Sequence, residues 1–357
     1  MHNVKAAFVE NDNFPLCLAP MVGLTHIVQR KIIQSYMPKN ASTFWPTEML
    51  NSRRLPNEPL GRSSETYAEN DESNLVPQLL GNEKKAIYDS IHLLAKAWGV
   101  KGIDINMGCP VQKALRHNYG VSLMGDSDYA AQVVRYAVEA SRELAAPLPI
   151  SVKLRAVEQN KNFSELLFFV DKLVQAGASW ITLHPRSPQQ QRRGQADWAQ
   201  IAELKKNISV PVIGNGDIQV AQDVLRMLEE TDADKVMAGR AFIARPWMAA
   251  QLGEKLGFAI EQKLPQNPSE EGAEYGRMLR HYIELCEQYF MQKVGMSESL
   301  VLRRILFFVK TTHVWLQFGH TLHAQLTRAQ NLQQMQDIVC DFFSQEQIMV
   351  EKTELRQ

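Results

Sequence analysis

The feature of this sequence that most constrains its fold is a series of eight short apolar runs separated by longer stretches of helical periodicity. Several runs are apolar at nearly every position and are flanked by Gly or Pro, which is typical of strands covered on both faces of a sheet. Helical patterns lie between them, at residues 83–98, 129–144, 164–176 and 220–228. The strand-like runs are residues 16–19, 43–48, 75–80, 102–106, 150–154, 180–184, 211–214 and 235–239.

This alternation predicts an α/β protein with a (β/α)8 barrel, the TIM-barrel architecture, because that fold requires eight strands with helices between them. An open doubly wound sheet is the alternative. Such a sheet usually has fewer strands, and the first strand here is not followed by the GxGxxG motif of dinucleotide-binding sheets.

The chain is longer than one barrel needs. Its 357 residues exceed the roughly 250–300 residues at which a single core stops growing, which favours a second, smaller domain. Residues 263–275 contain Pro, Gly and Glu, and the pattern beyond them is helical, with Gly295 and Gly319 between helices. We therefore predict a barrel over residues 1–255, a linker over 256–275 and an all-helical C-terminal domain over 276–357.

Composition narrows the class of protein. Lys plus Arg and Asp plus Glu both number 39, so the net charge of zero gives no bulk attraction to nucleic acid, although a local basic face is compatible with it. The four cysteines form no CxxC pair, which argues against a zinc site or a disulfide framework and favours a reducing compartment. No apolar run approaches the ~18–20 residues of a membrane span, and the polar opening residues do not resemble a secretory signal. We expect a cytoplasmic protein without a metal.

Polar side chains follow nearly every predicted strand. In a (β/α)8 barrel the active site lies at the carboxyl ends of the strands, so these residues are expected to face one site. Together with the end of the first strand, they are Ala19, Pro20, Met21, Glu48, Gln78, Asn106, Cys109, Lys153, Arg155, His184, Arg186, Asn215, Gly216, Asp217, Gly239 and Arg240.

The ends of the seventh and eighth strands favour a phosphate site. Gly-Asn-Gly-Asp, which ends at Asp217, and Ala-Gly-Arg, which ends at Arg240, place flexible backbone N–H groups where this barrel commonly holds a phosphate. Arg240 can add a bidentate contact. Either motif alone is better explained as a tight turn, whereas the two together favour phosphate.

Lys153 is predicted to point into the same site. A buried lysine is costly without an anionic partner, and a reduced flavin, which carries negative charge at its pyrimidine end, would supply one. A salt bridge to Glu48 or Asp104 is the structural alternative. Gln78 also has two explanations, a hydrogen bond to the pyrimidine edge of a flavin or solvation of the barrel end.

Cys109 lies on a Gly-Cys-Pro turn directly after the fourth strand. A lone cysteine is more often a small buried hydrophobic residue than a catalyst. Its place on a loop at the catalytic face favours a role as a proton donor. The other three cysteines are interpreted as packing residues, and no role is assigned to five histidines: His92, His117, His281, His313 and His323.

Seven segments resemble, in order and spacing, the signatures of the tRNA-dihydrouridine synthases: LAPMVGLT, VPQLLG, IDINMGCPVQK, SVKLR, ITLHPRS, VPVIGNGDI and MAGRAFIARPW. The NMGCP segment followed by Lys113 is the most specific of them. The resemblance implies an FMN-binding barrel with a C-terminal helical domain that reduces particular uridines in tRNA with NADPH. It also implies a flipped-out target base and binding of the remaining tRNA through phosphate contacts and shape.

The resemblance also implies roles for individual residues. Cys109 would protonate C5 of the uracil while a hydride from the flavin N5 reaches C6, and Asn106, with Arg155 and Arg186 nearby, would position the base. The residues that would hold FMN are Gln78, Lys153 and His184 at the ring system, Ala19, Pro20 and Met21 at its face, and Asn215, Gly216, Asp217, Gly239 and Arg240 at the ribityl chain and phosphate.

The C-terminal third carries a modest basic excess. Between residues 277 and 328 there are seven Lys or Arg and three Asp or Glu. The segment LRRILFFVKTTHVWL resembles the tRNA-facing helix of the family, which makes Arg303, Arg304 and Lys310 candidate phosphate contacts. An ordinary solvated helix face explains the same residues.

The sequence departs from the family pattern on the substrate side. Pro185 stands where the family usually has Gly, which removes one backbone donor, and AVEQNKN replaces a common Gly-Trp pair after Arg155. The loop ALRHNYGVSLMG after Lys113 is bulkier than the usual small residues, and Arg192 and Arg193 add charge to another loop. These changes leave FMN expected and the target uridine open.

Two other functions compete with tRNA uridine reduction. A small-molecule flavin oxidoreductase, of the dihydroorotate dehydrogenase or ene-reductase type, would share the phosphate site but would not need a basic helical tail. A non-catalytic RNA-binding barrel would not need Lys153, His184 and Cys109. We expect a monomer, because the tail already covers a partner surface, and the preference for NADPH is implied by the resemblance alone.

Overall fold

The computed structural model describes residues 12–109, 116–156, 162–190 and 193–354. Eight parallel strands form one sheet in the order β1-β8-β7-β6-β5-β4-β3-β2, and β1 and β2 come together at its two ends. This near-closed barrel confirms the predicted architecture. The strands are β1 (Leu16–Leu18), β2 (Trp45–Asn51), β3 (Leu75–Leu80), β4 (Ile103–Met107), β5 (Ile150–Arg155), β6 (Trp180–His184), β7 (Val212–Asn215) and β8 (Lys235–Ala238).

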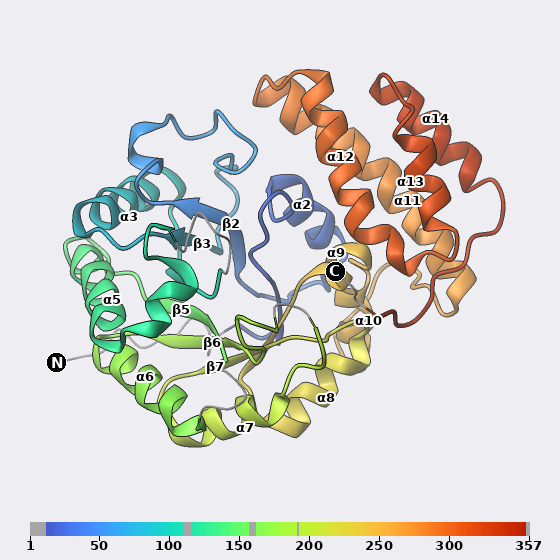
Figure 1. The fold of residues 1–357 in the computed structure, drawn as a ribbon. Coiled ribbons are helices and arrows are strands. Elements are labelled where there is room, and N and C mark those ends of the chain that lie inside the picture. The colour runs from blue at the N-terminus through green and yellow to red at the C-terminus, as the bar shows by residue number, and fades with distance from the viewer. Residues whose placement is uncertain (1–11, 110–115, 157–161, 191–192, 355–357) are drawn as a thin grey trace.

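Helices alternate with the strands and surround the barrel (Figure 1). Their apolar faces pack on the strands, and the polar faces meet solvent, as the 3.6-residue periodicity of the sequence requires. They are α2 (Ile27–Ser35), α3 (Lys84–Trp98), α5 (Ser127–Arg142), α6 (Phe163–Gln175), α7 (Trp198–Asn207), α8 (Ala221–Thr231), α9 (Arg240–Ala244) and α10 (Met248–Lys255), with short 3₁₀ turns η1 (Leu55–Asn57) and η2 (Gly120–Gly125).

The barrel interior divides into an apolar layer and a polar layer. Phe44, Trp180, Ile213 and Met237 belong to one small buried cluster, and the rings of Phe44 and Trp180 are 6.0 Å apart. Successive strand residues point to opposite faces of the sheet, so every second residue points into the barrel. The inward positions beyond this cluster carry polar side chains. They form the floor of the site described below.

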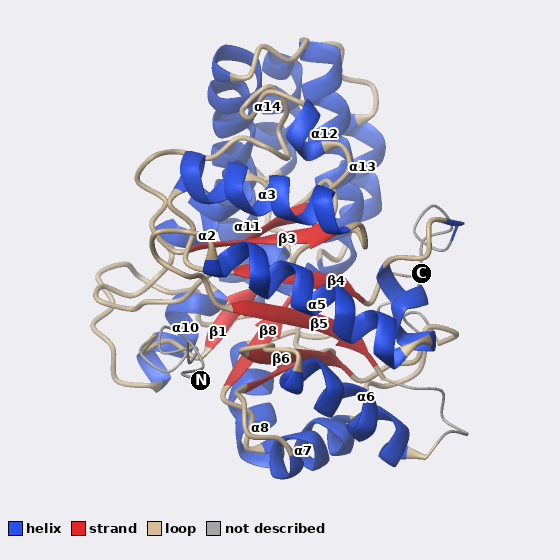
Figure 2. Ribbon diagram, turned by 90° about the vertical axis from the view of Figure 1, so that its left-hand side faces the viewer, coloured by secondary structure: helices blue, strands red, loops and turns tan. Residues whose placement is uncertain are grey.

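The C-terminal part of the chain is a bundle of helices on one side of the barrel (Figure 2). Its helix α11 packs against α2, and α12 packs against α9. A single apolar cluster includes side chains of both the barrel and the bundle. The bundle consists of α11 (Pro268–Cys286), the π-helical turn η3 (Glu287–Lys293), α12 (Glu298–Thr312), η4 (His313–Trp315), α13 (Gly319–Leu326) and α14 (Leu332–Phe342).

The predicted linker differs from the structure in its second half. Helix α11 begins at Pro268, so residues 268–275 are helical. Asn267 caps the helix by accepting the N–H of Glu270 at 2.9 Å, and Pro268 occupies the first turn, where its missing N–H costs nothing. The division into a barrel of residues 1–255 and a separate domain of residues 276–357 stays a prediction.

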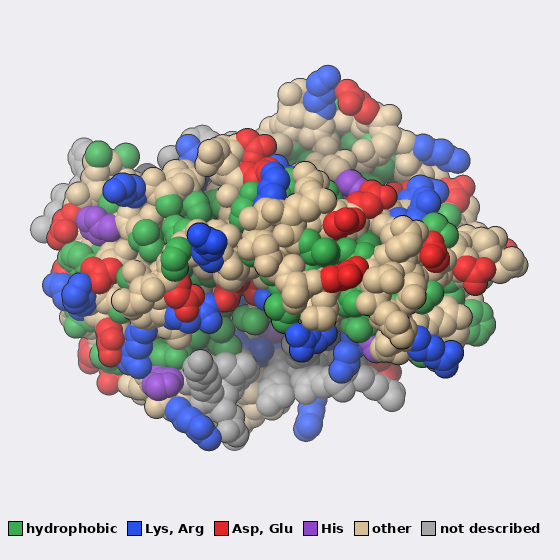
Figure 3. All heavy atoms as spheres, turned by 90° about the horizontal axis from the view of Figure 1, so that it is seen from above, with side chains coloured by type: hydrophobic (Ala, Val, Ile, Leu, Met, Phe, Trp, Pro, Cys, Tyr) green, Lys and Arg blue, Asp and Glu red, His purple; other side chains and the backbone are tan. Residues whose placement is uncertain are grey.

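None of the helices in the described part of the chain combines the length and apolar character needed to cross a bilayer. Acidic and basic side chains are interspersed over the face shown in Figure 3, without one dominant sign. This mixed surface agrees with the net charge of zero.

Candidate active site

A cavity of about 220 Å³ lies at the carboxyl ends of β5 to β8 and is referred to here as the mouth cavity. It brings together most of the predicted site residues, although they are up to 221 positions apart in sequence. Those that line it are Ala19, Pro20, Met21, Lys153, Arg155, His184, Arg186, Asn215, Gly216, Asp217, Gly239 and Arg240, joined by Ile218, Met237, Ala238 and Ala241. The remaining barrel candidates, Gln78, Asn106 and Cys109, lie on β3, on β4 and directly after β4.

Positive charge dominates the lining of the mouth cavity, with Lys153, Arg155, Arg186 and Arg240 against the single carboxylate of Asp217. Burial lowers the pKa of Lys153 to about 8, and the charge of Arg155 adds to the effect. Lys153 Nζ donates to Asn215 Oδ1 at 3.0 Å, and neither alternative partner, Glu48 or Asp104, is within ion-pair distance. The cavity is therefore suited to an anionic ligand.

His184 is held in its neutral form. Burial lowers its pKa well below the usual value, and the four neighbouring cationic side chains lower it further. Its Nε2 lies 3.3 Å from Arg186 Nη1. Because a guanidinium can only donate, Nε2 is the acceptor and Nδ1 carries the ring hydrogen. His184 thus offers a donor at Nδ1 without adding charge to the cavity.

The loop after β7 is fixed by Asp217. Its carboxylate accepts from Arg186 Nη2 at 2.5 Å and from the backbone N–H of Ala196 at 2.6 Å. Gly216 has φ +126°, and a Cβ there would lie 2.9 Å from the Cβ of Ala196. Only glycine fits this position, so the Gly-Asn-Gly-Asp motif forms a close-packed wall of the cavity.

A continuous chain of hydrogen bonds connects the barrel interior to the backbone of Cys109. The carboxylate of Asp104 accepts from Ser151 Oγ at 2.6 Å and from Gln78 Nε2 at 2.7 Å. Gln78 Oε1 in turn accepts from Asn106 Nδ2 at 2.7 Å. Asn106 Oδ1 then accepts the N–H of Cys109 at 2.9 Å. The four side chains of Ser151, Asp104, Gln78 and Asn106 are all buried, so the network fixes the orientation of both amide side chains.

Cys109 is half-buried beside the mouth cavity. Its side chain packs with Met49, Leu80 and Tyr119, and the nearby Arg155 lines the mouth cavity. Arg155 Nε donates to the carbonyl of the preceding Gly108 at 2.9 Å. Leu80 on β3 and Arg155 on β5 thereby hold the Cys109 turn from the two neighbouring strands.

The remaining cysteines agree with the packing interpretation in two of three cases. Cys17 and Cys286 are fully buried, and burial raises the pKa of Cys17 to about 12. Cys340 is exposed on α14.

The candidate phosphate contacts in the helical bundle divide into two groups. Arg303 and Arg304 on α12 line an open groove of about 540 Å³ with Arg62 and Val22 of the barrel and the half-exposed ring of Phe307. Lys310 is exposed on α12 and lies outside the groove.

Glu48 is a site residue whose role the sequence left open. Its carboxylate is 1% exposed, accepts the N–H of Gly23 at 2.5 Å and lies 3.8 Å from Arg304 Nη1. Burial raises its pKa. Glu48 thus joins the loop that carries Ala19 to Met21 to the helical bundle.

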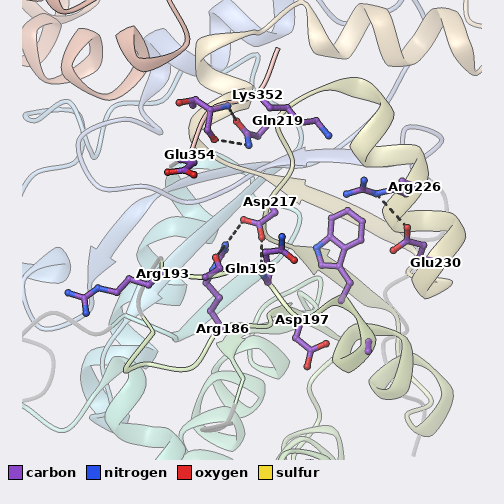
Figure 4. Close-up of a pocket in the computed structure, with 15 residues that line it drawn as sticks. Arg186, Arg193, Gln195, Asp197, Asp217, Gln219, Arg226, Glu230, Lys352 and Glu354 are labelled. Carbon is purple, nitrogen blue, oxygen red and sulfur yellow. Dashed lines mark hydrogen bonds and ion pairs between the residues drawn. The ribbon is translucent and has the colours of Figure 1, made fainter. Parts of the chain in front are cut away.

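A larger pocket of about 1280 Å³ adjoins the mouth cavity and shares Arg186 and Asp217 with it. Figure 4 shows Arg186 reaching Asp217 on one side and the C-terminal segment at Lys352 lying beside Gln219 on the other. Lys352 Nζ donates to Asp223 Oδ1 at 2.6 Å. This pocket is lined by both acidic and basic side chains, and Arg226 is paired with Glu230. It is therefore less suited to an anionic ligand than the mouth cavity.

Sequence reasoning missed Ser151 and the linking role of Asp104. The signal was present, because Asp104 and Asn106 are two positions apart on β4 and so face the same side of the sheet. A carboxylate at an inward position of a barrel strand needs donors, and Gln78 and Ser151 lie at the paired positions of β3 and β5.

The family model and the named relatives that this chain matches indicate one family. The model of the family described as "Dihydrouridine synthase (Dus)" matches residues 17–343. A "Probable tRNA-dihydrouridine synthase" of Mycobacterium tuberculosis (strain CDC 1551 / Oshkosh) is 32% identical over 67% of this chain and 61% of its own length. A relative with the same name in Aquifex aeolicus (strain VF5) is 31% identical over 69% of this chain and 75% of its own length. Another, in Rickettsia bellii (strain RML369-C), is 29% identical over 77% of this chain and 80% of its own length. The match thus spans about three fifths of the mycobacterial relative, and the chain belongs to the dihydrouridine synthase family.

Proposed function

We propose that this protein reduces uridines in tRNA to 5,6-dihydrouridine, with FMN as cofactor and NADPH as reductant. The observation that carries the proposal is the position of the cationic mouth cavity beside the Cys109 turn, in a barrel of a family that is FMN-dependent. Arg155 both lines the cavity and donates to the carbonyl of Gly108 in that turn. Its substrate, its cofactor and the residue roles are those that the family resemblance implies, and the geometry of the site supports them.

The residues of the mouth cavity fit a flavin mononucleotide. Arg186 is 7% exposed, and its Nε finds no hydrogen-bond partner within the described residues, which is costly for a buried donor. A phosphate or flavin oxygen would satisfy it. The closely packed Gly216 permits a ligand to approach the backbone, and Arg240 adds a second guanidinium at the end of β8.

FMN bound here would supply a hydride to C6 of the uracil ring. Lys153 would stabilise negative charge at the pyrimidine end of the flavin, and His184 would donate from Nδ1. Gln78 would present its remaining N–H, since its other amide hydrogen and its oxygen are engaged by Asp104 and Asn106. Asn215, Gly216 and Asp217, together with Gly239 and Arg240, would hold the ribityl chain and phosphate, and Ala19, Pro20 and Met21 would lie against the ring.

The Cys109 thiol would provide the proton that the reduction requires. When C6 gains a hydride, an electron pair and negative charge develop at C5 and O4, so a proton must be added at C5. A thiol can donate that proton and leave a thiolate, which is then reprotonated from solvent. The hydrogen bond from the Cys109 N–H to Asn106 holds the donor at the rim of the cavity.

The tRNA body would bind along the groove between barrel and bundle. Arg303 with Arg62 at the groove, and Lys310 farther along α12, would contact phosphates. Arg304 is partly neutralised by Glu48 and would contribute less. Arg155 and Arg186 would lie near the target base, with Asn106 acting mainly through the Cys109 turn. A monomer in the cytoplasm stays our expectation.

A position-resolved dihydrouridine assay tests the proposal. The purified, FMN-loaded protein is incubated with NADPH and tRNA from a strain that lacks the modification, and the product is mapped by mass spectrometry. Dihydrouridine at one or two defined positions is the expected result, and Cys109→Ala should retain FMN while losing most turnover. An FMN-loaded protein that oxidises NADPH but leaves every uridine unchanged would contradict the tRNA substrate and point to a small-molecule flavin oxidoreductase.

A further inference from the structure

Three planar side chains stack at the rim of the site, beside Cys109. The imidazole of His117 lies 5.5 Å from the ring of Tyr119, with only 11° between their planes. The guanidinium of Arg53 lies 5.8 Å from the centre of the same ring. Tyr119 is buried, whereas His117 is exposed to solvent. We refer to these residues as the His117 stack.

The backbone at His117 and Asn118 is held in place by Asn82. Asn82 Nδ2 donates to the carbonyl oxygens of His117 and Asn118, at 3.1 Å and 2.9 Å. Asn118 has φ +55°, in the left-handed region that asparagine tolerates better than most residues. Asn82 itself is buried. The imidazole is therefore presented on a rigid support, which lowers the entropy cost of binding a ligand against it.

The hydrogen bonds of the stack define what His117 offers to a ligand. Arg53 Nη1 lies 3.3 Å from His117 Nδ1. Since the guanidinium can only donate, Nδ1 is the acceptor and Nε2 carries the ring hydrogen. Arg53 also pairs with Glu83 at 3.0 Å, and its Nε has no hydrogen-bond partner within the described part of the chain. The stack thus combines an exposed aromatic face with the N–H donor of His117 Nε2 at its edge.

The His117 stack is close to the reacting end of the site. The ring of Tyr119 packs with Cys109 in one apolar cluster, and the N–H of Val121 donates to the carbonyl of Cys109 at 3.1 Å. A uracil that lies between Cys109 and the flavin would leave the nucleotides on either side of it at this rim. Exposed Arg116, next to His117 in the chain, adds positive charge there.

We propose that His117 is a substrate-binding residue that stacks on the base of a nucleotide adjacent to the target uridine. Flat, exposed aromatic side chains beside cationic groups are a common platform for single-stranded RNA, because every base has a π face. The proposal rests on the proposed function and extends it to the recognition of the flanking nucleotide. His117 and Tyr119 stand in a loop where this sequence is bulkier than the family pattern, so the contact would be particular to this chain.

Three variants at this position separate stacking from other roles. His117→Ala removes the ring and is expected to lower kcat/KM for tRNA by about 5- to 160-fold, the range for losing one base–aromatic contact. His117→Phe keeps a flat ring without its N–H and should stay within about threefold of the wild type. His117→Lys keeps a donor without the ring and should resemble the alanine variant.

His92→Ala is a matched control. His92 is also a partly exposed histidine, stacked on Tyr88 at 6.2 Å and 14°, but it lies on α3. It should leave kcat/KM for tRNA unchanged. A His117→Ala enzyme that matches His92→Ala while the wild type forms dihydrouridine would overturn the inference and leave the proposed function intact. Absence of product from the wild type would overturn both.

A modified substrate tests the contact from the RNA side. Once the target uridine is mapped, two transcripts are prepared, each with an abasic site at one of its two neighbours. One abasic site should lower kcat/KM for the wild type to about the same extent as His117→Ala does, and should have little additional effect in that variant. Equal losses in both proteins at both positions would show that His117 does not contact a flanking base.

Discussion

Asn106 holds Cys109 by its backbone, because Asn106 Oδ1 accepts the Cys109 N–H at 2.9 Å. The same oxygen accepts the N–H of Gly108 at 3.1 Å, and the Asn106 amide group donates to Gln78. The Asn106 oxygen and one of its two amide hydrogens are thus engaged within the protein. We infer from these bonds that Asn106 acts chiefly by setting the position of the Cys109 turn.

Asn106→Asp should separate positioning from stability. The carboxylate can still accept from Gly108 and Cys109, but it cannot donate to Gln78 Oε1, so two acceptors would face each other. We expect a loss of dihydrouridine turnover of about tenfold or more, because small displacements of a catalytic group are costly. Single-turnover rates with FMN-loaded protein measure the effect.

Asn74→Ala serves as the control for this experiment. Asn74 also donates from its side-chain amide to a backbone carbonyl, that of Thr43 at 3.2 Å, but it precedes β3 at the opposite end of the barrel. It should cost stability without changing turnover. Equal turnover in the two variants would show that Asn106 does not position the Cys109 turn.

Lys153→Met should have opposite effects on stability and on cofactor binding. Below about pH 8 the buried lysine is charged, and its lowered pKa means that this charge is destabilising without a ligand. Removing it should stabilise the cofactor-free protein at pH 7 by about 1–3 kcal/mol, from the size of the pKa shift. FMN affinity should fall about tenfold or more, since the cavity loses a cation. Thermal unfolding and fluorimetric FMN titration give the two values.

The pH dependence of stability provides a second test of Lys153. Between about pH 8 and pH 10.5 the unfolded lysine keeps its proton while the folded one has lost it, so stability should rise with pH in that window. Lys153→Met should remove this component, whereas Lys84→Met, at an exposed lysine on α3, should not. A cofactor-free Lys153→Met protein less stable than the wild type at pH 7 would contradict the argument.

Much of the barrel was predictable because its signals are local. Each strand is a short apolar run with turn residues at its ends, and the number of such runs leaves few closed architectures. The carboxyl-end rule then places Lys153 and Gly239 at one rim from sequence alone, although they lie 86 positions apart.

Contacts between distant segments were not predictable in the same way. The pairing of Glu48 with Arg304 depends on how α12 packs against the barrel, and no local pattern of either segment encodes it. The His117 stack likewise requires the loop after β2 to meet the loop after β4. The start of α11 at Pro268 was missed because Pro and Gly were read as breakers, although Asn before Pro is also a helix-start signal.

The ion pair between Glu48 and Arg304 should contribute to the docking of the helical bundle. Arg304→Met leaves the Glu48 carboxylate buried without the cation that pairs with it, and we expect a loss of about 1–3 kcal/mol in the free energy of unfolding at pH 7. Because burial already raises the pKa of Glu48, the loss should shrink as the pH falls and the carboxyl is protonated. Urea unfolding at pH 5 and pH 7 measures this difference.

The double variant Glu48→Gln with Arg304→Met provides the control for that prediction. Glutamine keeps an oxygen that can accept from Gly23 but carries no charge, so it should restore part of the stability lost at pH 7. A loss that is independent of pH and unchanged by Glu48→Gln would mean that Arg304 acts through packing alone.

Gln219 should control the attachment of the C-terminal segment to the barrel. Its Oε1 accepts from Trp315 Nε1 and from the N–H of Thr353, both at 3.0 Å, and its Nε2 donates to the Thr353 carbonyl at 3.1 Å. Gln219→Ala removes all three bonds and leaves the buried indole N–H unpaired, so we expect a loss of about 1–3 kcal/mol. Hydrogen exchange should accelerate in peptides that cover residues 349–354. Because Gln219 follows Asp217 by two positions, FMN affinity should also fall severalfold.

Gln222→Ala, at an exposed position on α8, is the control and should change neither the exchange nor the FMN affinity. Unchanged exchange in Gln219→Ala would show that the Lys352–Asp223 ion pair and the main-chain bond between Val350 and Trp315 hold the segment without Gln219.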